Sequence, residues 1–386
     1  YSLQESEQSI MVVNTIIQDS KDSNPLIRSL ATRTMCRIHI EGVAENMIIP
    51  LKERLDDSDP YVRKTAALGV AKLYDTVPEA IDNCNIYPKL IELLNDSNPL
   101  VVSNAAAAIM EINSKRSDPI VKFTPSNISA ISNAIISSSE WCQIILLDAI
   151  AKYEPTDSDE AATMIDRLTP LLKNANPAVV IGAFKSIFVM MDYDERLPQD
   201  IFPTIIPPLL TLVTTSEPEI QYVVLRTLTL FVHKYPHSLQ NEIRLFFIKY
   251  NDPSYVKMQK LEILTANCTP RNGTAVLDEL TEYCNDVDVQ FVKKAVKAIG
   301  EISLKLEAFA RRCVEILINI VEGKAEYSVE QAIIVICDIL RRYPGQFESI
   351  IEKVCNNVEQ LKDPQSRASL IWILGEYNQL IDKVDV

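Results

Sequence analysis

Glycine is scarce in this sequence, with 8 residues among 386. The two nearest glycines, Gly323 and Gly345, stand 22 positions apart. The chain therefore contains neither a G-x-G-x-x-G dinucleotide loop nor a G-x-x-x-x-G-K-[ST] phosphate loop. The same scarcity argues against an all-β chain, because tight hairpin turns need glycine at positive φ.

Long apolar runs are also missing. No uninterrupted apolar stretch reaches the length that a membrane-spanning helix needs, so the sequence predicts no such span. Basic residues are outnumbered, since 38 lysines and arginines face 52 aspartates and glutamates, and the formal net charge is −14. An acidic chain repels nucleic acid and anionic lipid. We therefore expect no nucleic-acid partner and mainly indirect contact with membranes.

Residues that carry catalysis or bind metals are few and scattered. None of the eight cysteines forms a C-x-x-C motif, and most lie in apolar helical stretches, as reduced thiols do in the core of a cytosolic protein. His233 and His237 are four residues apart, but Pro236 lies between them and should end the helix, so they would not share a face. The sequence predicts no catalytic residue, no metal, no cofactor and no enzyme activity.

A repeat of about 38 residues organises the chain, which is the sign of a solenoid. Most units open with aspartate, asparagine or serine followed by proline, as in DSNPLIRSLATRTM around Pro25 and DSDPYVRKTAALGV around Pro60. The polar side chain caps the helix, and proline stands where its missing N–H costs nothing. Six residues after the proline position a small residue recurs as a predicted packing position, at Ala31, Ala66, Ala105, Ala183 and Ala295.

A second set of helices is predicted between the proline-started ones. Eight expected segments cover 44–55, 87–94, 161–172, 201–212, 239–248, 274–283, 308–320 and 346–358. About ten helix pairs in succession make an all-α fold of the α-solenoid class, with HEAT/armadillo-type repeats. We expect residues 1–386 to form one continuous solenoid.

The pattern D-x-[DN]-P-x-[VI]-R resembles the HEAT repeat, in which aspartate and arginine side chains of stacked repeats form a ladder. Asp22 and Arg28 carry it in one unit, and Asp57 and Arg63 in the next. In the third unit Val102 stands where arginine would be. The resemblance thus implies a ladder in the first units only.

Two further features could serve partners. The basic cluster of Lys293, Lys294 and Lys297 could contact a phosphate or an acidic peptide, although a solvated face with internal ion pairs explains it more simply. The stretch IMVVNTII at 10–17 is apolar over a wide arc. Such a helix is either buried or docks a partner, and the pattern leaves both open.

Several longer stretches together resemble the trunk of the β-adaptin family, large subunits of heterotetrameric clathrin adaptor complexes. The resemblance runs in order along nearly the whole chain and rests on NPLIRSLATRTM (24–35), DPYVRKTAALGVAKLYD (59–75), VDVQFVKKAVKAIGE (287–301), YPGQFESIIEKVCNNVEQL (343–361) and SLIWILGEY (369–377). It implies a scaffold that assembles with a second large, a medium and a small adaptin subunit. It also implies a cytoplasmic protein, peripheral on clathrin-coated vesicles of the Golgi, endosomes or plasma membrane.

The resemblance implies one further partner and several missing parts. In trans-Golgi β-adaptins an Arf-family GTPase docks on the helix before the NPLIR segment, at positions that match Ile10 and Val13. Internal packing of these two residues is the alternative. The family's basic N-terminal stretch, clathrin-box hinge and appendage are not in this sequence, so clathrin would bind only through segments absent here. A HEAT-type nuclear transport receptor or a phosphatase scaffold remains the alternative function.

Overall fold

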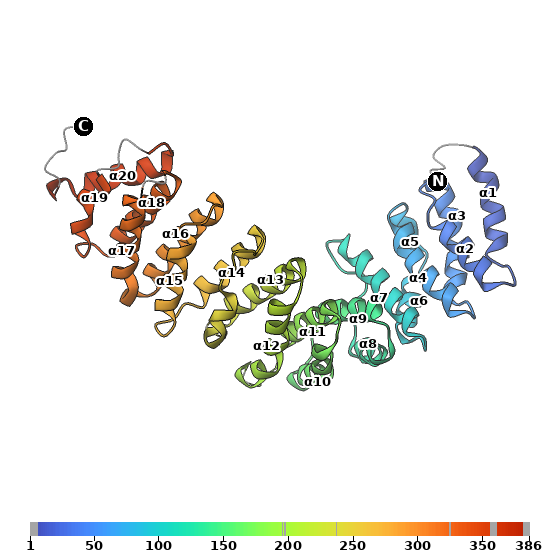
Figure 1. Cartoon of the computed structure of the whole chain (residues 1–386). Coiled ribbons are helices and arrows are strands. Elements are labelled where there is room, and N and C mark those ends of the chain that lie inside the picture. The colour runs from blue at the N-terminus through green and yellow to red at the C-terminus, as the bar shows by residue number, and fades with distance from the viewer. Residues whose placement is uncertain are drawn as a thin grey trace. The chain divides into compact units, whose positions relative to one another are not determined.

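The computed structural model describes residues 7–194, 196, 198–236, 238–323, 326–355 and 361–380. Within these ranges the regular elements are all helices and no strand occurs, so the predicted all-α class is confirmed (Figure 1). The chain divides into two compact units, Tyr1–Pro208 and Leu209–Val386, and the boundary falls inside α12 (Pro198–Thr215). One continuous solenoid over 1–386 stays a prediction.

The first unit consists of two layers of helices. In the first layer each helix packs against the next, in the order α2 (Pro25–Met35), α4 (Pro60–Tyr74), α7 (Pro99–Ser114), α9 (Glu140–Ala151) and α11 (Pro177–Met190). The second layer contains α1 (Glu7–Asp19), α3 (Glu41–Leu55), α5 (Pro78–Asn83), α6 (Tyr87–Glu92), η1 (Leu93–Asn95), α8 (Pro125–Ser137), α10 (Ser158–Leu168) and η2 (Thr169–Lys173). This alternation of layers is the expected stack of helix pairs.

The second unit repeats the arrangement. Its first layer is α13 (Pro218–Lys234), α14 (Ser254–Ala266), α16 (Val289–Lys305), α18 (Glu326–Arg342) and α20 (Pro364–Glu376), again packed in sequence (Figure 1). The intervening elements are η3 (Gln240–Phe246), α15 (Gly273–Tyr283), α17 (Glu307–Glu322), η4 (Glu348–Ile350) and α19 (Ile351–Cys355), and η6 (Asn378–Leu380) follows α20.

Two of the predicted second-layer α-helices are wrong, because these segments form 3₁₀ helices or a much shorter α-helix. The segment 239–248 forms the 3₁₀ helix η3, which is interrupted by non-helical backbone at Glu242. In place of a helix over 346–358 the chain forms the short η4 and then α19, and residues 356–360 lie outside the described part. No side chain caps the start of η3 or of η4, and such short 3₁₀ pieces commonly serve as connectors.

The recurrent start of the first-layer helices has a local hydrogen-bond explanation. Asn24 Oδ1 accepts from Leu26 N at 3.0 Å, and Asp59 Oδ1 accepts from Tyr61 N at 2.8 Å, which caps α2 and α4. Two positions earlier, Asp57 Oδ1 accepts from Asp59 N at 2.9 Å. The two polar residues of D-x-[DN]-P therefore satisfy successive backbone donors at the helix entrance.

The interior of both layers is apolar and closely packed. The predicted small-residue positions are all buried, as expected where first-layer helices approach one another: Ala31, Ala66, Ala105, Ala183 and Ala295. Glycine permits the same approach at Gly300, where a Cβ would collide with Val335 on α18. Among the described residues, no helix is both long enough and apolar enough to cross a bilayer.

Candidate functional site

A buried ion pair links the first two proline-started helices. Arg28 on α2 donates from Nε and Nη2 to the two carboxylate oxygens of Asp57, at 2.9 and 2.8 Å. Arg54 Nη1 donates to the same carboxylate at 2.9 Å. The Asp57 side chain is only 3% exposed, so its charge depends on these partners.

The same arrangement occurs one unit later, where Asp96 is the acceptor. Arg63 donates from Nε and Nη2 to Asp96, at 2.7 and 3.0 Å. Each arginine thus pairs with the aspartate of the following unit. Its Nη1 atom also donates to a backbone carbonyl at the start of its own unit: Arg28 donates to Asp22 O, and Arg63 donates to Asp57 O. Asp22 itself forms no ion pair within the described ranges.

Electrostatics support the charged state of the first pair. Burial acts to raise the pKa of Asp57, but the hydrogen bonds from Arg28 and from Asp59 N outweigh it and lower the pKa below its ordinary value. The hydrogen bond to Asp57 raises the pKa of Arg28, and the bond to Asp96 raises that of Arg63. These pairs hold neighbouring repeats together.

A comparable ion pair in the second unit does not match the D-x-[DN]-P-x-[VI]-R pattern. Lys257 Nζ donates to Asp286 at 2.6 Å and lies 5.4 Å from the centre of the Phe291 ring. Asp286 stands three residues before Val289, as Asp57 stands three before Pro60. The basic residue, however, is lysine and stands one position later than arginine does in the first unit. Allowing either basic residue at either position would have found it.

Helix α1 carries the two residues matched to the GTPase site. The Ile10 side chain lies outside the part of the structure that can be described. Val13 is buried, with 7% of its surface exposed, whereas the neighbouring Val12 is 40% exposed. Helix α1 packs against α2 and α3, and Val13 belongs to that packing. This burial favours the internal role that the apolar pattern had left open.

The described residues offer no constellation for catalysis or metal binding. They contain no cluster of three or more His, Cys, Asp or Glu side chains that could hold a metal ion. His233 lies near the end of α13, and His237 lies outside the described residues. Burial raises the pKa of Cys36 and Cys284 to about 12, so these thiols stay protonated and unreactive at neutral pH.

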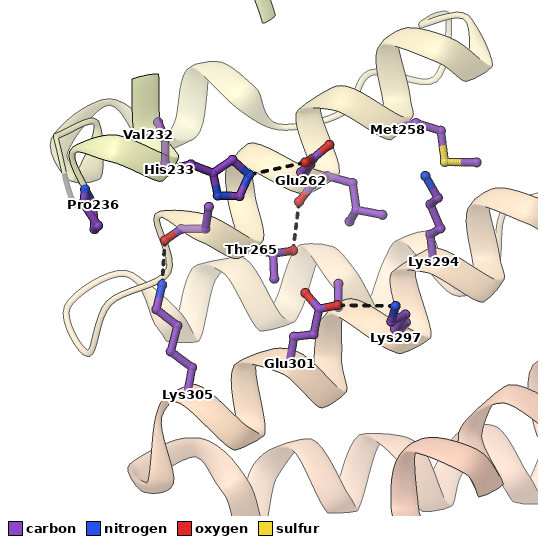
Figure 2. A pocket seen from close by; sticks show the side chains of 13 residues that line it. Val232, His233, Pro236, Met258, Glu262, Thr265, Lys294, Lys297, Glu301 and Lys305 are labelled. Carbon is purple, nitrogen blue, oxygen red and sulfur yellow. Dashed lines mark hydrogen bonds and ion pairs between the residues drawn. The ribbon is translucent and has the colours of Figure 1, made fainter. Parts of the chain in front are cut away.

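A hollow in the described part of the second unit lies across α13, α14 and α16 (Figure 2). We call it the α14 groove. Its volume is about 570 Å³. The buried side chains of Val232, Leu261 and Ala298 contribute apolar surface to its lining.

Charged side chains surround this apolar surface. Three lysines and two glutamates line the groove, although acidic residues outnumber basic ones in the whole chain. Glu262 lies 3.5 Å from His233, and Glu301 lies 3.9 Å from Lys297. Lys305 Nζ donates to Ala266 O at 2.6 Å. The acidic side chains of the groove therefore already have partners.

A smaller hollow in the first unit has a similar character. It crosses α2, α4 and α7, has a volume of about 170 Å³ and is lined by Arg33, Lys64 and Lys72 without any carboxylate. Lys64 Nζ lies 4.3 Å from the centre of the Tyr61 ring. In each unit, therefore, cations gather over the first-layer helices.

Comparison with known proteins covers the whole chain. A family model described as "Adaptin N terminal region" matches residues 1–386. The AP-1 complex subunit beta-1 of Mus musculus and that of Homo sapiens are each 44% identical over 392 residues. The AP-2 complex subunit beta of Schizosaccharomyces pombe is 36% identical over 372 residues, covering 96% of this chain and 55% of the relative. The chain spans 41% of the length of the mouse and human relatives.

Solved structures show the same fold at low identity. A homology model of the full-length AP-3 complex in an intermediate open conformation matches with a TM-score of 0.67 and 18% identity, over 97% of this chain and 66% of that one. An engineered protein matches with a TM-score of 0.58 and 16% identity, over 94% of this chain and 98% of that one. Both support the helical-repeat architecture alone.

Proposed function

Because the chain belongs to the adaptin N-terminal region family, we propose that it is the trunk of a β-type large subunit in a clathrin adaptor complex. Its role is that of a non-enzymatic scaffold in vesicular transport of membrane-protein cargo. The observation that carries this proposal is the 44% identity to AP-1 β subunits along the entire chain. Two layers of stacked helices provide the long surface that a scaffold offers to its partners.

The proposed partners are a second large adaptin, a medium subunit and a small subunit. Its proposed location is the cytoplasm, peripheral on coated vesicles of the Golgi, endosomes or plasma membrane. The relatives include both AP-1 and AP-2 β subunits, which leaves two adaptor types as candidates.

Co-expression tests the scaffold proposal directly. The chain, tagged at one end, is expressed with the other three subunits of an AP-1 complex and, separately, of an AP-2 complex, and then purified by the tag. We expect stoichiometric recovery of medium and small subunits with one of the two sets. Recovery of none, together with capture of a Ran-type GTPase or a phosphatase catalytic subunit, would overturn the proposal in favour of the alternative scaffold classes.

An Arf-family GTPase is the further proposed partner, through α1. The burial of Val13 means that Val13→Asp would disturb packing as well as binding, so the informative substitutions are Ile10→Glu and, at an exposed neighbour, Val12→Glu. We expect both to weaken binding of the GTP-loaded GTPase to the assembled complex, and Val12→Glu to do so without lowering its melting temperature. Unchanged affinity in both variants would remove this partner.

A further inference from the structure

The α14 groove combines an apolar surface with lysine ammonium groups that can still donate hydrogen bonds to a ligand. Lys294 forms no ion pair with any residue in the described ranges. Lys305 donates one hydrogen bond, to Ala266 O, and an ammonium group has three donors. By contrast Glu262 and Glu301 already face His233 and Lys297. A ligand entering this groove therefore meets two ammonium groups with free donors, whereas Glu301 faces Lys297 and Glu262 faces a histidine that is charged only when protonated.

The two available lysines are separated along one face of a single helix. Lys294 and Lys305 both lie on α16, eleven residues apart, which is close to three turns and about 16 Å along the axis. Figure 2 shows Lys294 with Met258 at one end of the groove and Lys305 with Pro236 at the other. One phosphate or one carboxylate cannot reach both cations. The spacing calls for an elongated ligand with an anionic group near each end.

The apolar surface between the lysines indicates that the ligand is apolar between its two anionic groups. Val232, Leu261 and Ala298 come from three different helices and form the floor of the groove, with the half-buried Met258 beside them, so side chains that fill the groove would be removed from water. An amphipathic helix presents such side chains at positions i, i+4 and i+7, and three of its turns match the distance between the lysines. Lys294 and Lys305 place positive charge at the two ends of this surface, which favours a partner with carboxylates at the matching positions.

We infer that the α14 groove docks an acidic amphipathic helix of a partner protein. Its apolar side chains lie against Val232, Leu261 and Ala298, and its two carboxylates, about three turns apart, pair with Lys294 and Lys305. The inference does not depend on which adaptor type the chain belongs to. It concerns a surface of the second unit alone and is tested on the chain without other subunits.

The experiment measures fluorescence anisotropy of a labelled designed peptide with the 386-residue chain. The peptide is a helix of about 16 residues with leucines at i, i+4 and i+7 and a glutamate near each end, and the matched peptide has glutamine in place of glutamate. We expect the glutamate peptide to bind about tenfold more tightly than the glutamine peptide. The variant Lys294→Glu/Lys305→Glu should abolish that difference while retaining its circular dichroism spectrum and melting temperature.

A matched variant separates the groove from general charge. Lys64→Glu/Lys72→Glu makes the same charge change beside the hollow of the first unit, and we expect it to leave peptide binding unchanged. Loss of binding in this variant instead, or in both variants equally, would overturn the assignment. Failure of the glutamate peptide to bind the unaltered chain would also overturn it. So would a result in which no peptide binds but phosphatidylserine vesicles bind through Lys294 and Lys305. None of these outcomes bears on recovery of adaptin subunits.

Discussion

Arg28 and Asp57 join two consecutive repeats through a two-pronged ion pair, with Nε···Oδ2 at 2.9 Å and Nη2···Oδ1 at 2.8 Å. The planar guanidinium matches both carboxylate oxygens, and its third nitrogen holds Asp22 O and Ser23 O at the entrance of its own helix. One side chain therefore fixes the start of α2 relative to the start of α4. Its loss should loosen the junction between these helices.

Replacing Asp57 by asparagine should destabilise the first unit by about 3 kcal/mol, because Arg28 and Arg54 would keep buried charge without a counter-ion. Hydrogen exchange of α2 and α4 should accelerate accordingly. Asp22→Asn is the control, since Asp22 occupies the same position one unit earlier but forms no ion pair within the described residues. Its cost should stay below about 1 kcal/mol. Equal effects of the two substitutions would contradict this prediction.

Acid should weaken the same junction. The pKa of Asp57 is lower in the folded chain than in the unfolded one, so its contribution is complete above the unfolded pKa of about 3.9 and is lost as pH falls through the folded value. The stability difference between the unaltered chain and Asp57→Asn should therefore shrink as pH drops from 5 towards 2. Urea unfolding at a series of pH values measures it, and a constant difference would speak against the pair.

Lys257 and Asp286 should show energetic coupling in the second unit. A double-mutant cycle with Lys257→Met and Asp286→Asn should give an interaction energy of about 1.5 kcal/mol, because both side chains are largely removed from water. The control cycle is Arg311→Met with Glu315→Gln, an exposed pair four residues apart on α17. It should give less than about 0.5 kcal/mol. Similar coupling in the two cycles would refute the distinction.

Gly300 should resist replacement by alanine. The new Cβ would collide with Val335, whose branched side chain has little freedom to move aside, and we expect a loss of about 1–3 kcal/mol. Gly375 on α20 has no atom within 4 Å of the equivalent position. Gly375→Ala should therefore be neutral or stabilising by up to about 1 kcal/mol. Melting temperatures of the two variants compare them directly, and a harmless Gly300→Ala would show that α16 and α18 can separate.

Much of the first layer could be predicted from residue patterns because its signals are local. An aspartate or asparagine before proline caps a helix whatever surrounds it, and α2, α4, α7 and α11 begin at the predicted prolines. The second layer was less predictable. The segment 239–248 has helical spacing but no capping side chain, and its backbone settles into the 3₁₀ turn η3.

In the ladder, the spacing pattern identifies charged residues but not the residues with which they pair. The residues Asp22, Arg28, Asp57 and Arg63 were found from their motif, yet their partners depend on stacking. Arg63 pairs with Asp96, and the Asp22 carboxylate forms no ion pair within the described residues. Lys257 and Asp286 were missed because the basic residue shifts by one position. The α14 groove was invisible as a whole, since its lining is contributed by three helices from different repeats.

Helix class, repeat period and the absence of phosphate-binding loops follow from the residue pattern, because capping, amphipathic spacing and glycine content act within a few residues of the chain. Which charges pair, whether Val13 is buried and where cations surround an apolar groove were decided only in the folded chain. The paired side chains lie 29 residues apart in both Arg28–Asp57 and Lys257–Asp286, and the packing of successive repeats brings them within hydrogen-bond distance.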